Sequence, residues 1–437
     1  MPGLFLAIAW FALLLYAMRR VRFFRDAPGL PMRAVATLFA LKAVAGAAVW
    51  AVYTYAYPDR ATADIFKYFD DSRVLHEALF TRPSDWFRML FGIGNDTPWF
   101  TEQYYKEMNH WVRRWDSGLH NDAHTMIRFN AVLRLLSFGH YAVHAVFAAW
   151  VSTVGALALY RALEPLVRHA RRGLAISVFL WPSVLFWGSG VLKECLLLLG
   201  LGFVLLAAIG PWARALDPRR VVVLVLGAAL MGLVKAYVLL CLLPPLIAYA
   251  WCRWKPGRTG LKFLAVHVVL VSAALLLGRL LPQLDPLYIL AMKQSDFIGL
   301  TREVPTGSII NLPVLEPETR SFVANAPHAL ANAFLSPFAV LGSGPLAWVG
   351  ALESALLVAV PLLALWRRRP WSAIDRPALF YALAFIMLLA LLIGWTVPVV
   401  GALVRYRVPL LPFVGLVALL LVDPARLPSR LRTFIAP

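Results

Sequence analysis

The sequence predicts an all-α, polytopic integral membrane protein with about eleven transmembrane helices. Of its 437 residues, 61% are hydrophobic and 15% are charged, whereas soluble proteins are roughly half apolar and about a quarter charged. Apolar runs recur along the whole chain, and about 20 helical residues are enough to cross the hydrocarbon core of a bilayer. Every second loop between these runs is rich in arginine.

The expected spans follow from these apolar runs, taken in chain order. The first run is followed, not preceded, by its arginines, so we expect a retained helix and not a cleaved signal peptide. The expected spans cover residues 3–18, 34–56, 141–163, 174–188, 191–212, 221–235, 238–252, 262–281, 345–366, 377–395 and 408–422.

The basic loops predict the orientation, because short loops rich in lysine and arginine stay in the cytoplasm. This rule places the N-terminus outside and the C-terminus in the cytoplasm. It also accounts for the net charge of +19 through topology and anionic lipid head groups, so we expect no nucleic-acid partner. The basic segments are 19–25, 168–172, 217–220, 253–258, 366–370 and 426–432.

We expect one integral membrane domain over residues 1–437 with two outer elements. The larger, 58–138, holds eleven of the 23 acidic residues. The second, 282–344, ends with an amphipathic segment, 324–338, which we expect to lie as a helix on the outer surface. The two halves show no internal repeat, although many secondary transporters are built from repeated halves.

An acidic cluster opens the larger outer element, in the stretch ATADIFKYFDDS (61–72). In a helix, Asp64, Tyr68 and Asp71 would share one face, with Asp70 beside them. A carboxylate held at the membrane surface can act as a general base on a hydroxyl that arrives from outside. The alternative is an exposed, ion-paired helix in which Lys67 pairs with the aspartates at helical spacing.

The stretch WPSVLFWGSGVLKECLLL (181–198) places Lys193 and Glu194 between two apolar runs. The span before them has only about 15 residues, or about 22 Å, so this pair should sit at or below the membrane surface. Ionisable residues at that depth usually face a cavity or a partner. A simple outer anchor is the alternative.

Three further cations, Lys235, Arg405 and Arg407, are expected on outward turns, where they oppose the charge bias of the other loops. A lipid phosphate would hold them there, because arginine offers phosphate a two-pronged donor and lysine a compact charge. Snorkelling to ordinary lipid phosphates is the alternative.

Two weaker patterns lie in the outer element. HNDAH (120–124) spaces His120 and His124 at i and i+4 around Asp122, which allows a divalent metal but lacks a recognised third ligand. We therefore expect no certain cofactor. The aromatic side chains of 95–115 suit stacking on sugar rings or an interfacial aromatic belt.

The motifs KYFDDS (67–72), IRFNAVLRLLSFGHY (127–141), FWGSGVLKE (186–194) and VRYRVPLLPF (404–413) resemble an uncharacterised group of bacterial membrane proteins placed beside the GT-C superfamily of polytopic glycosyltransferases. The likeness spans most of the chain. In many GT-C enzymes the catalytic loop follows the first span, whereas here it follows the second.

The resemblance implies transfer of a sugar from a polyprenyl-phosphate donor to an acceptor hydroxyl on the periplasmic side of a bacterial inner membrane. The acceptor would be a lipid-linked glycan, a lipid or a protein. A loop aspartate would act as base with inversion, Asp64 first, then Asp71 and Asp70. Lys193, Lys235, Arg405 and Arg407 would bind the donor phosphate, with Glu194 and Tyr68 in support. The alternatives are a lipid-linked oligosaccharide polymerase or ligase and, from another class, a flippase or transporter.

Overall fold

The computed structural model describes residues 2–56, 59–112, 120–210, 217–303, 308–336 and 345–435. Over these residues the secondary structure is helical, and β-type pairing is limited to the isolated bridges Ile309–Val399 and Arg368–Val422. The predicted all-α class is therefore confirmed.

Within the described ranges, seven helices are long and apolar enough to cross a membrane, or up to nine if each of two bent helix pairs counts as one span. The chain is thus a multi-pass helical membrane protein, and the finer expectation of eleven spans stays a prediction. The seven helices are α1 (Pro2–Arg20), α3 (Met32–Tyr55), α8 (Tyr141–Leu163), α12 (Pro218–Trp254), α13 (Thr259–Leu280), α16 (Pro345–Trp366) and α17 (Arg376–Thr396).

Some of the expected spans are not single straight helices. Residues 174–188 divide among α9 (Arg171–Phe179), α10 (Pro182–Phe186) and the 3₁₀ turn η5 (Trp187–Ser189). The break before α10 has a local cause, since proline disfavours helical geometry in the residue before it. The expected span 191–212 begins as α11 (Lys193–Ala208), and its residues 211 and 212 lie outside the described ranges.

Both bent pairs arise at such interruptions. The segment Pro182–Ser189 meets α11 at 111°, and α18 (Val400–Tyr406) meets α19 (Leu411–Leu421) at 55°, where 408–422 had been expected to be one span. The expected spans 221–235 and 238–252 join in α12, which is interrupted at Lys235, where φ is −152° and ψ is 74°. Hydropathy alone does not locate these interruptions.

The chain divides into two compact units. The first comprises Met1–Ala162 and Leu185–Ala236, and the second comprises Leu163–Val184 and Tyr237–Pro437.

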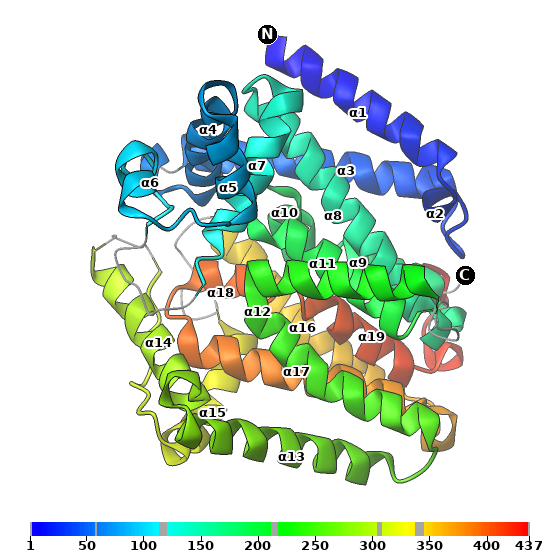
Figure 1. Cartoon of the computed structure of the whole chain (residues 1–437). Coiled ribbons are helices and arrows are strands. Elements are labelled where there is room, and N and C mark those ends of the chain that lie inside the picture. Colours follow the sequence, from blue (N-terminus) through cyan, green and yellow to red (C-terminus); the bar gives the residue numbers. More distant parts are fainter. Residues whose placement is uncertain are drawn as a thin grey trace. The chain divides into compact units, whose positions relative to one another are not determined.

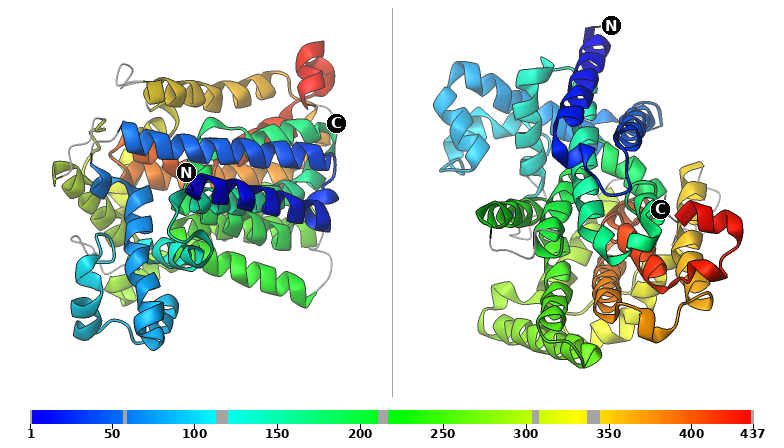
Figure 2. Two further views of the ribbon diagram at one scale, coloured as in Figure 1. Left: turned by 90° about the horizontal axis from the view of Figure 1, so that it is seen from above. Right: turned by 90° about the vertical axis from the view of Figure 1, so that its right-hand side faces the viewer.

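In the first unit, α1 lies against α3 and α8 (Figures 1 and 2), through the stacked pair Phe11–Phe39 and the ring contact Trp10–Phe147. The short helix α2 (Arg22–Arg25) connects α1 to α3. The helices α8 and α11 approach each other closely at Gly155 and Gly202. A side chain at Gly202 would collide with the Gly155 carbonyl, so glycine is needed there.

The larger outer element folds as a layer of helices at the C-terminal end of α3 (Figure 1). Its helix α4 packs on α5 and α7, with Arg134 of α7 donating to the Phe69 carbonyl at 2.6 Å and to Ser72 Oγ at 2.8 Å. A proline starts α5 and Gly92, at φ 70°, ends it. The helices are α4 (Asp64–Thr81), α5 (Pro83–Phe91), α6 (Pro98–Gln103) and α7 (Ala123–Ser137).

The second unit packs α15 (Thr319–Leu335) along α17, with Ala329 so close to Gly394 that no side chain fits there. The amphipathic segment expected at 324–338 is therefore part of a longer helix with a buried face; its residues 337 and 338 lie outside the described ranges. The unit also contains α14 (Pro286–Glu303) and α20 (Ser429–Ile435).

The close crossing of α8 and α11 predicts that Gly202→Ala destabilises the protein by about 1–3 kcal/mol, because the new methyl group has no space. The matched control is Gly232→Ala in α12, where nothing lies within 4 Å of the added atom. That change should be neutral or stabilising by up to about 1 kcal/mol. Thermal unfolding in detergent measures both. Equal midpoints for the two variants would contradict the close crossing.

Candidate functional site

The candidate site lies in the first unit, at the N-terminus of α11. The chain reaches α11 through η5 and a turn, and glycines permit the tight packing there: a side chain at Gly188 would meet Leu198 and one at Gly190 would meet Val49. The η5 turn also packs on α3, where Gly46 leaves room for the Ser189 carbonyl. This packing fixes the position of the first turn of α11, and with it the charged side chains of Lys193 and Glu194.

Two consecutive residues of α11 form two ion pairs of different character. Lys193 Nζ lies 2.8 Å from Asp122 Oδ1, and these side chains are 10% and 28% exposed. Lys235 Nζ lies 2.7 Å from Glu194 Oε1, and these side chains are 2% and 0% exposed. The first pair is within reach of a ligand, whereas the second is sealed inside the unit.

The backbone of α11 adds to the positive charge at this point. A helix N-terminus carries a partial positive charge, which stabilises Glu194 and disfavours an ammonium group. Lys193 is held there nonetheless, by Asp122, and its Nζ lies 5.5 Å from the centre of the Tyr68 ring. The place would attract an anion that can compete with Asp122.

The predicted helix at the acidic cluster is confirmed, since α4 begins at Asp64. Tyr68 follows one turn later on the same face and is buried, while Asp64 is partly exposed. A carboxylate in the first turn of a helix is stabilised in its charged form by the helix dipole. Through Tyr68, this face of α4 is brought to Lys193.

The two other aspartates have structural partners. Asp71 is 2% exposed, and its carboxylate oxygens accept the backbone amides of Asn109 and His110, both at 2.8 Å. Burial raises the pKa of Asp71, and the two amides oppose this effect. Asp70 forms a two-pronged pair with Arg60 at 2.9 and 2.7 Å on the exposed side of α4. Of the candidate bases, Asp64 and Asp71 lie on the same face of α4 as Tyr68, and Asp64 is the more exposed of these two.

The two predicted arginines belong to the second unit. Arg407 is fully buried and donates to Ser354 Oγ at 2.9 Å and to the Ser336 carbonyl at 2.8 Å. Arg405 ends α18 and is 9% exposed. The Arg407 guanidinium therefore already donates to oxygen atoms of the protein, which limits its use as a phosphate ligand.

The residues proposed for a metal are held by other contacts. Asp122 pairs with Lys193, and the ring of His124 stacks on Trp111 at 3.9 Å with its Nε2 2.8 Å from the Trp111 carbonyl oxygen. Burial lowers the pKa of His124 to about 4. His120 is exposed. Within the part of the chain that the structure describes, no three His, Cys, Asp or Glu side chains are grouped to hold a metal ion.

The aromatic side chains of the outer element serve as its core. Phe100, Tyr105 and Trp111 are buried and stack in sequence, ending on His124. These rings are covered, so they do not offer a platform for a sugar. Trp99, which is 42% exposed, is an exception.

Two buried ionisable residues were not predicted from the sequence. Lys42 lies in the middle of α3, and its Nζ donates to Ser152 Oγ at 2.9 Å. Glu353 of α16, in the second unit, accepts from the amide and the hydroxyl of Ser183, both at 2.7 Å. Both residues could have been found in the sequence, because each is a single charged residue inside an apolar run. An ionisable residue inside a membrane span is a candidate functional residue.

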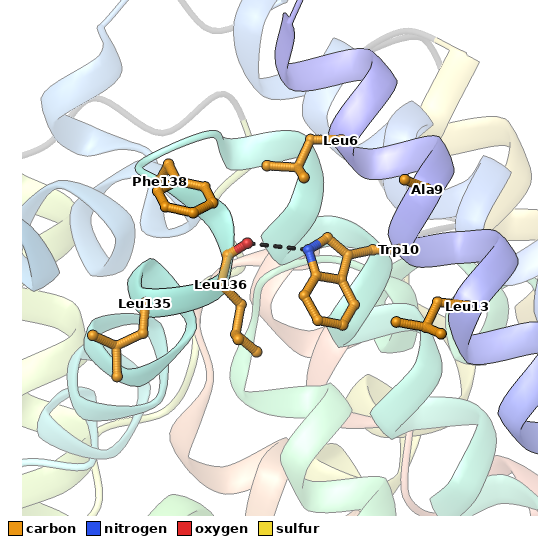
Figure 3. A pocket seen from close by; sticks show the side chains of 7 residues that line it. All are labelled: Leu6, Ala9, Trp10, Leu13, Leu135, Leu136 and Phe138. Carbon is orange, nitrogen blue, oxygen red and sulfur yellow. Dashed lines mark hydrogen bonds between the residues drawn. The ribbon is translucent and has the colours of Figure 1, made fainter.

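A groove of about 250 Å³ between α1 and the end of α7 is wholly apolar (Figure 3). Trp10 crosses it and donates its indole N–H to the Leu136 carbonyl at 3.0 Å. Because its lining offers no ionisable group, this groove supplies no chemistry and is separate from the candidate site.

Comparisons with family models, with curated proteins and with solved structures gave no match to this chain.

The anchoring role of Asp71 predicts that Asp71→Asn loosens the segment 104–112. An asparagine has one acceptor oxygen for two amides, and the loss should amount to about 1–3 kcal/mol. Amide exchange at Asn109 and His110, measured by mass spectrometry, should then accelerate at least about tenfold. Asp70→Asn, which removes only an exposed ion pair, is the control and should leave this segment unchanged. Unaltered exchange in Asp71→Asn would refute the anchoring role.

Proposed function

We propose that this protein is a membrane glycosyltransferase that moves a sugar from a polyprenyl-phosphate donor to an acceptor hydroxyl. The observation that supports this most is the cluster around Lys193. Lys193, which is 8% exposed and paired with Asp122 at the start of α11, lies over Tyr68, and the partly exposed Asp64 is one helical turn from Tyr68. Tyr68 thus connects the cation proposed for the phosphate with the helix that carries the carboxylate proposed for the hydroxyl.

The proposed reaction uses these groups in fixed roles. The Asp64 carboxylate accepts the proton of the acceptor hydroxyl as its oxygen attacks the anomeric carbon, and the configuration there inverts. The bond between that carbon and the phosphate oxygen breaks, and its electron pair stays on the lipid phosphate. Lys193 and the α11 N-terminus stabilise the negative charge that develops on the phosphate. Asp122, being partly exposed, can yield Lys193 to the phosphate.

Three of the other predicted residues, Glu194, Lys235 and Tyr68, support this arrangement. Glu194 and Lys235 neutralise each other out of solvent and hold the first turn of α11 in position. Tyr68 of α4 is buried, and its ring lies beneath the Lys193 ammonium group. Asp71 and Arg407 hold the fold and are no longer proposed as base or phosphate ligand. We further propose the periplasmic side of a bacterial inner membrane as the site of reaction.

A transporter of a lipid-linked or anionic substrate is the second candidate, because one specific observation favours it. The structure contains two broken helices, at 111° and 55°. Transporters often bind substrate at discontinuous helices, with helix N-termini facing an anionic group. Such a protein would bind the donor but release it unchanged.

The test is turnover of a panel of polyprenyl-phosphate sugars by the purified protein in lipid, for wild type, Asp64→Asn and the control Asp70→Asn. We expect Asp64→Asn to lose at least about 100-fold in turnover while retaining donor binding, because a general base contributes about 10²–10⁴-fold. Asp70→Asn should remain within a fewfold of wild type.

Other outcomes would contradict parts of this scheme. Full activity in Asp64→Asn would remove Asp64 as the base. Donor binding without turnover by wild type across the panel would favour the transporter. Absence of any donor binding would exclude both forms of the proposal.

A further inference from the structure

A second site is suggested by a pocket of about 1080 Å³ in the second unit. It lies where α12 ends and α13 and α17 begin. Its walls come from the loop before α13, including Gly257 and Arg258, and from the residues that precede α17, including Trp371 and Asp375. Nothing in the proposed transferase chemistry uses this pocket.

The pocket carries an excess of positive charge. Arg253, Arg258 and Arg376 line it, with Asp375 as the acidic residue. Asp375 pairs with Arg253 at 3.6 Å and also accepts the Ala378 amide. Across the described part of the chain, no side-chain hydrogen bond or ion pair engages Arg258 or Arg376. Two guanidinium groups are therefore available to an anion.

The backbone of the pocket strengthens this charge. Arg258 has left-handed geometry, with φ 50° and ψ 39°, which is uncommon outside glycine. It directly precedes α13, and the first turns of both α13 and α17 line the pocket. The first turn of α13 presents amide groups without helical partners and a partial positive charge, whereas in α17 Pro377 has no amide hydrogen and Asp375 caps the Ala378 amide. Guanidinium groups beside helix N-termini suit phosphate oxygens.

The surroundings of the pocket identify the source of the phosphate. The helix α13 is strongly apolar, and only 6% of its span is buried, so its sides face lipid. Leu261 and Phe380, which line the pocket, are 58% and 39% exposed, and Trp371 is 46% exposed. Exposed apolar side chains continue from the pocket along α13 at Leu261, Leu264, Val268 and Val271, as a ligand with acyl chains requires.

The geometry points to a binding site for an anionic phospholipid, with its phosphate head group between Arg258 and Arg376 and its acyl chains along α13. A soluble phosphate would use the same arginines but would gain nothing from the apolar surface. The inference is independent of the proposed transferase activity.

The experiment is a titration of the full-length protein in detergent, followed by native mass spectrometry, which counts bound lipids. The probes are dioctanoyl phosphatidylglycerol, dioctanoyl phosphatidylcholine and sn-glycerol 1-phosphate. The variant is Arg258→Gln/Arg376→Gln. The matched control is Arg279→Gln, an exposed arginine in the last turn of the same helix α13.

We expect wild type to bind phosphatidylglycerol at least about tenfold more tightly than the double variant, because the variant loses the charge-assisted hydrogen bonds of both guanidinium groups to the phosphate. Arg279→Gln should match wild type. Phosphatidylcholine and glycerol phosphate should bind more weakly to wild type than phosphatidylglycerol does.

Equal phosphatidylglycerol affinity in wild type and the double variant would overturn the site. Glycerol phosphate binding as tightly as the lipid would overturn the lipid assignment in favour of a soluble phosphate ligand. If the double variant fails to fold by circular dichroism, Arg258→Lys/Arg376→Lys replaces it. This variant retains charge but loses the two-pronged geometry, and unweakened binding by it would also contradict the proposal.

Discussion

A charge placed in an apolar interior must have a partner, and in the first unit this constraint is met by the pair of Lys235 and Glu194. Both side chains are almost fully buried and their atoms meet at 2.7 Å. Removing one partner of such a pair costs about 3–5 kcal/mol, because an uncompensated charge is left inside. The pair joins the interruption of α12 to the first turn of α11, and so fixes the position of the neighbouring Lys193. The candidate site is built outward from that point.

The need to pair buried charges also distinguishes two kinds of charged residue in the first unit: those that hold the fold together and those that a ligand could contact. Asp71 and Arg134 are buried and use their polar atoms to hold the outer helices together. Lys193 and Asp122 are paired, with side chains 10% and 28% exposed, and the partly exposed Asp64 begins α4. A ligand can therefore reach Lys193, Asp122 and Asp64 without disrupting the contacts of Asp71 and Arg134. On this division we propose the partly exposed Asp64, ahead of the buried Asp71, as the base.

The sequence predicted the class of fold well and the interruptions of its helices poorly. Composition and apolar runs located α1, α3, α8, α13, α16 and α17 to within a few residues, because burial in lipid imposes a long apolar stretch. The break at Lys235 and the bend before Lys193 arise from local geometry and tertiary contacts, which hydropathy does not record. The helical face shared by Asp64 and Tyr68 was predictable from spacing, whereas the partners of Asp71 are nearly forty residues away and were not.

The account rests on the claim that the place formed by α4 and the start of α11 receives a lipid phosphate. Photocrosslinking tests it most directly: a polyprenyl phosphate with a diazirine beside the phosphate is illuminated with the protein in lipid, and the labelled peptides are mapped by mass spectrometry. The account predicts label within residues 64–72 and 187–198, and its loss when unlabelled polyprenyl phosphate is added in excess. Label spread over lipid-facing helices such as α1 and α13, unaffected by the competitor, would contradict it.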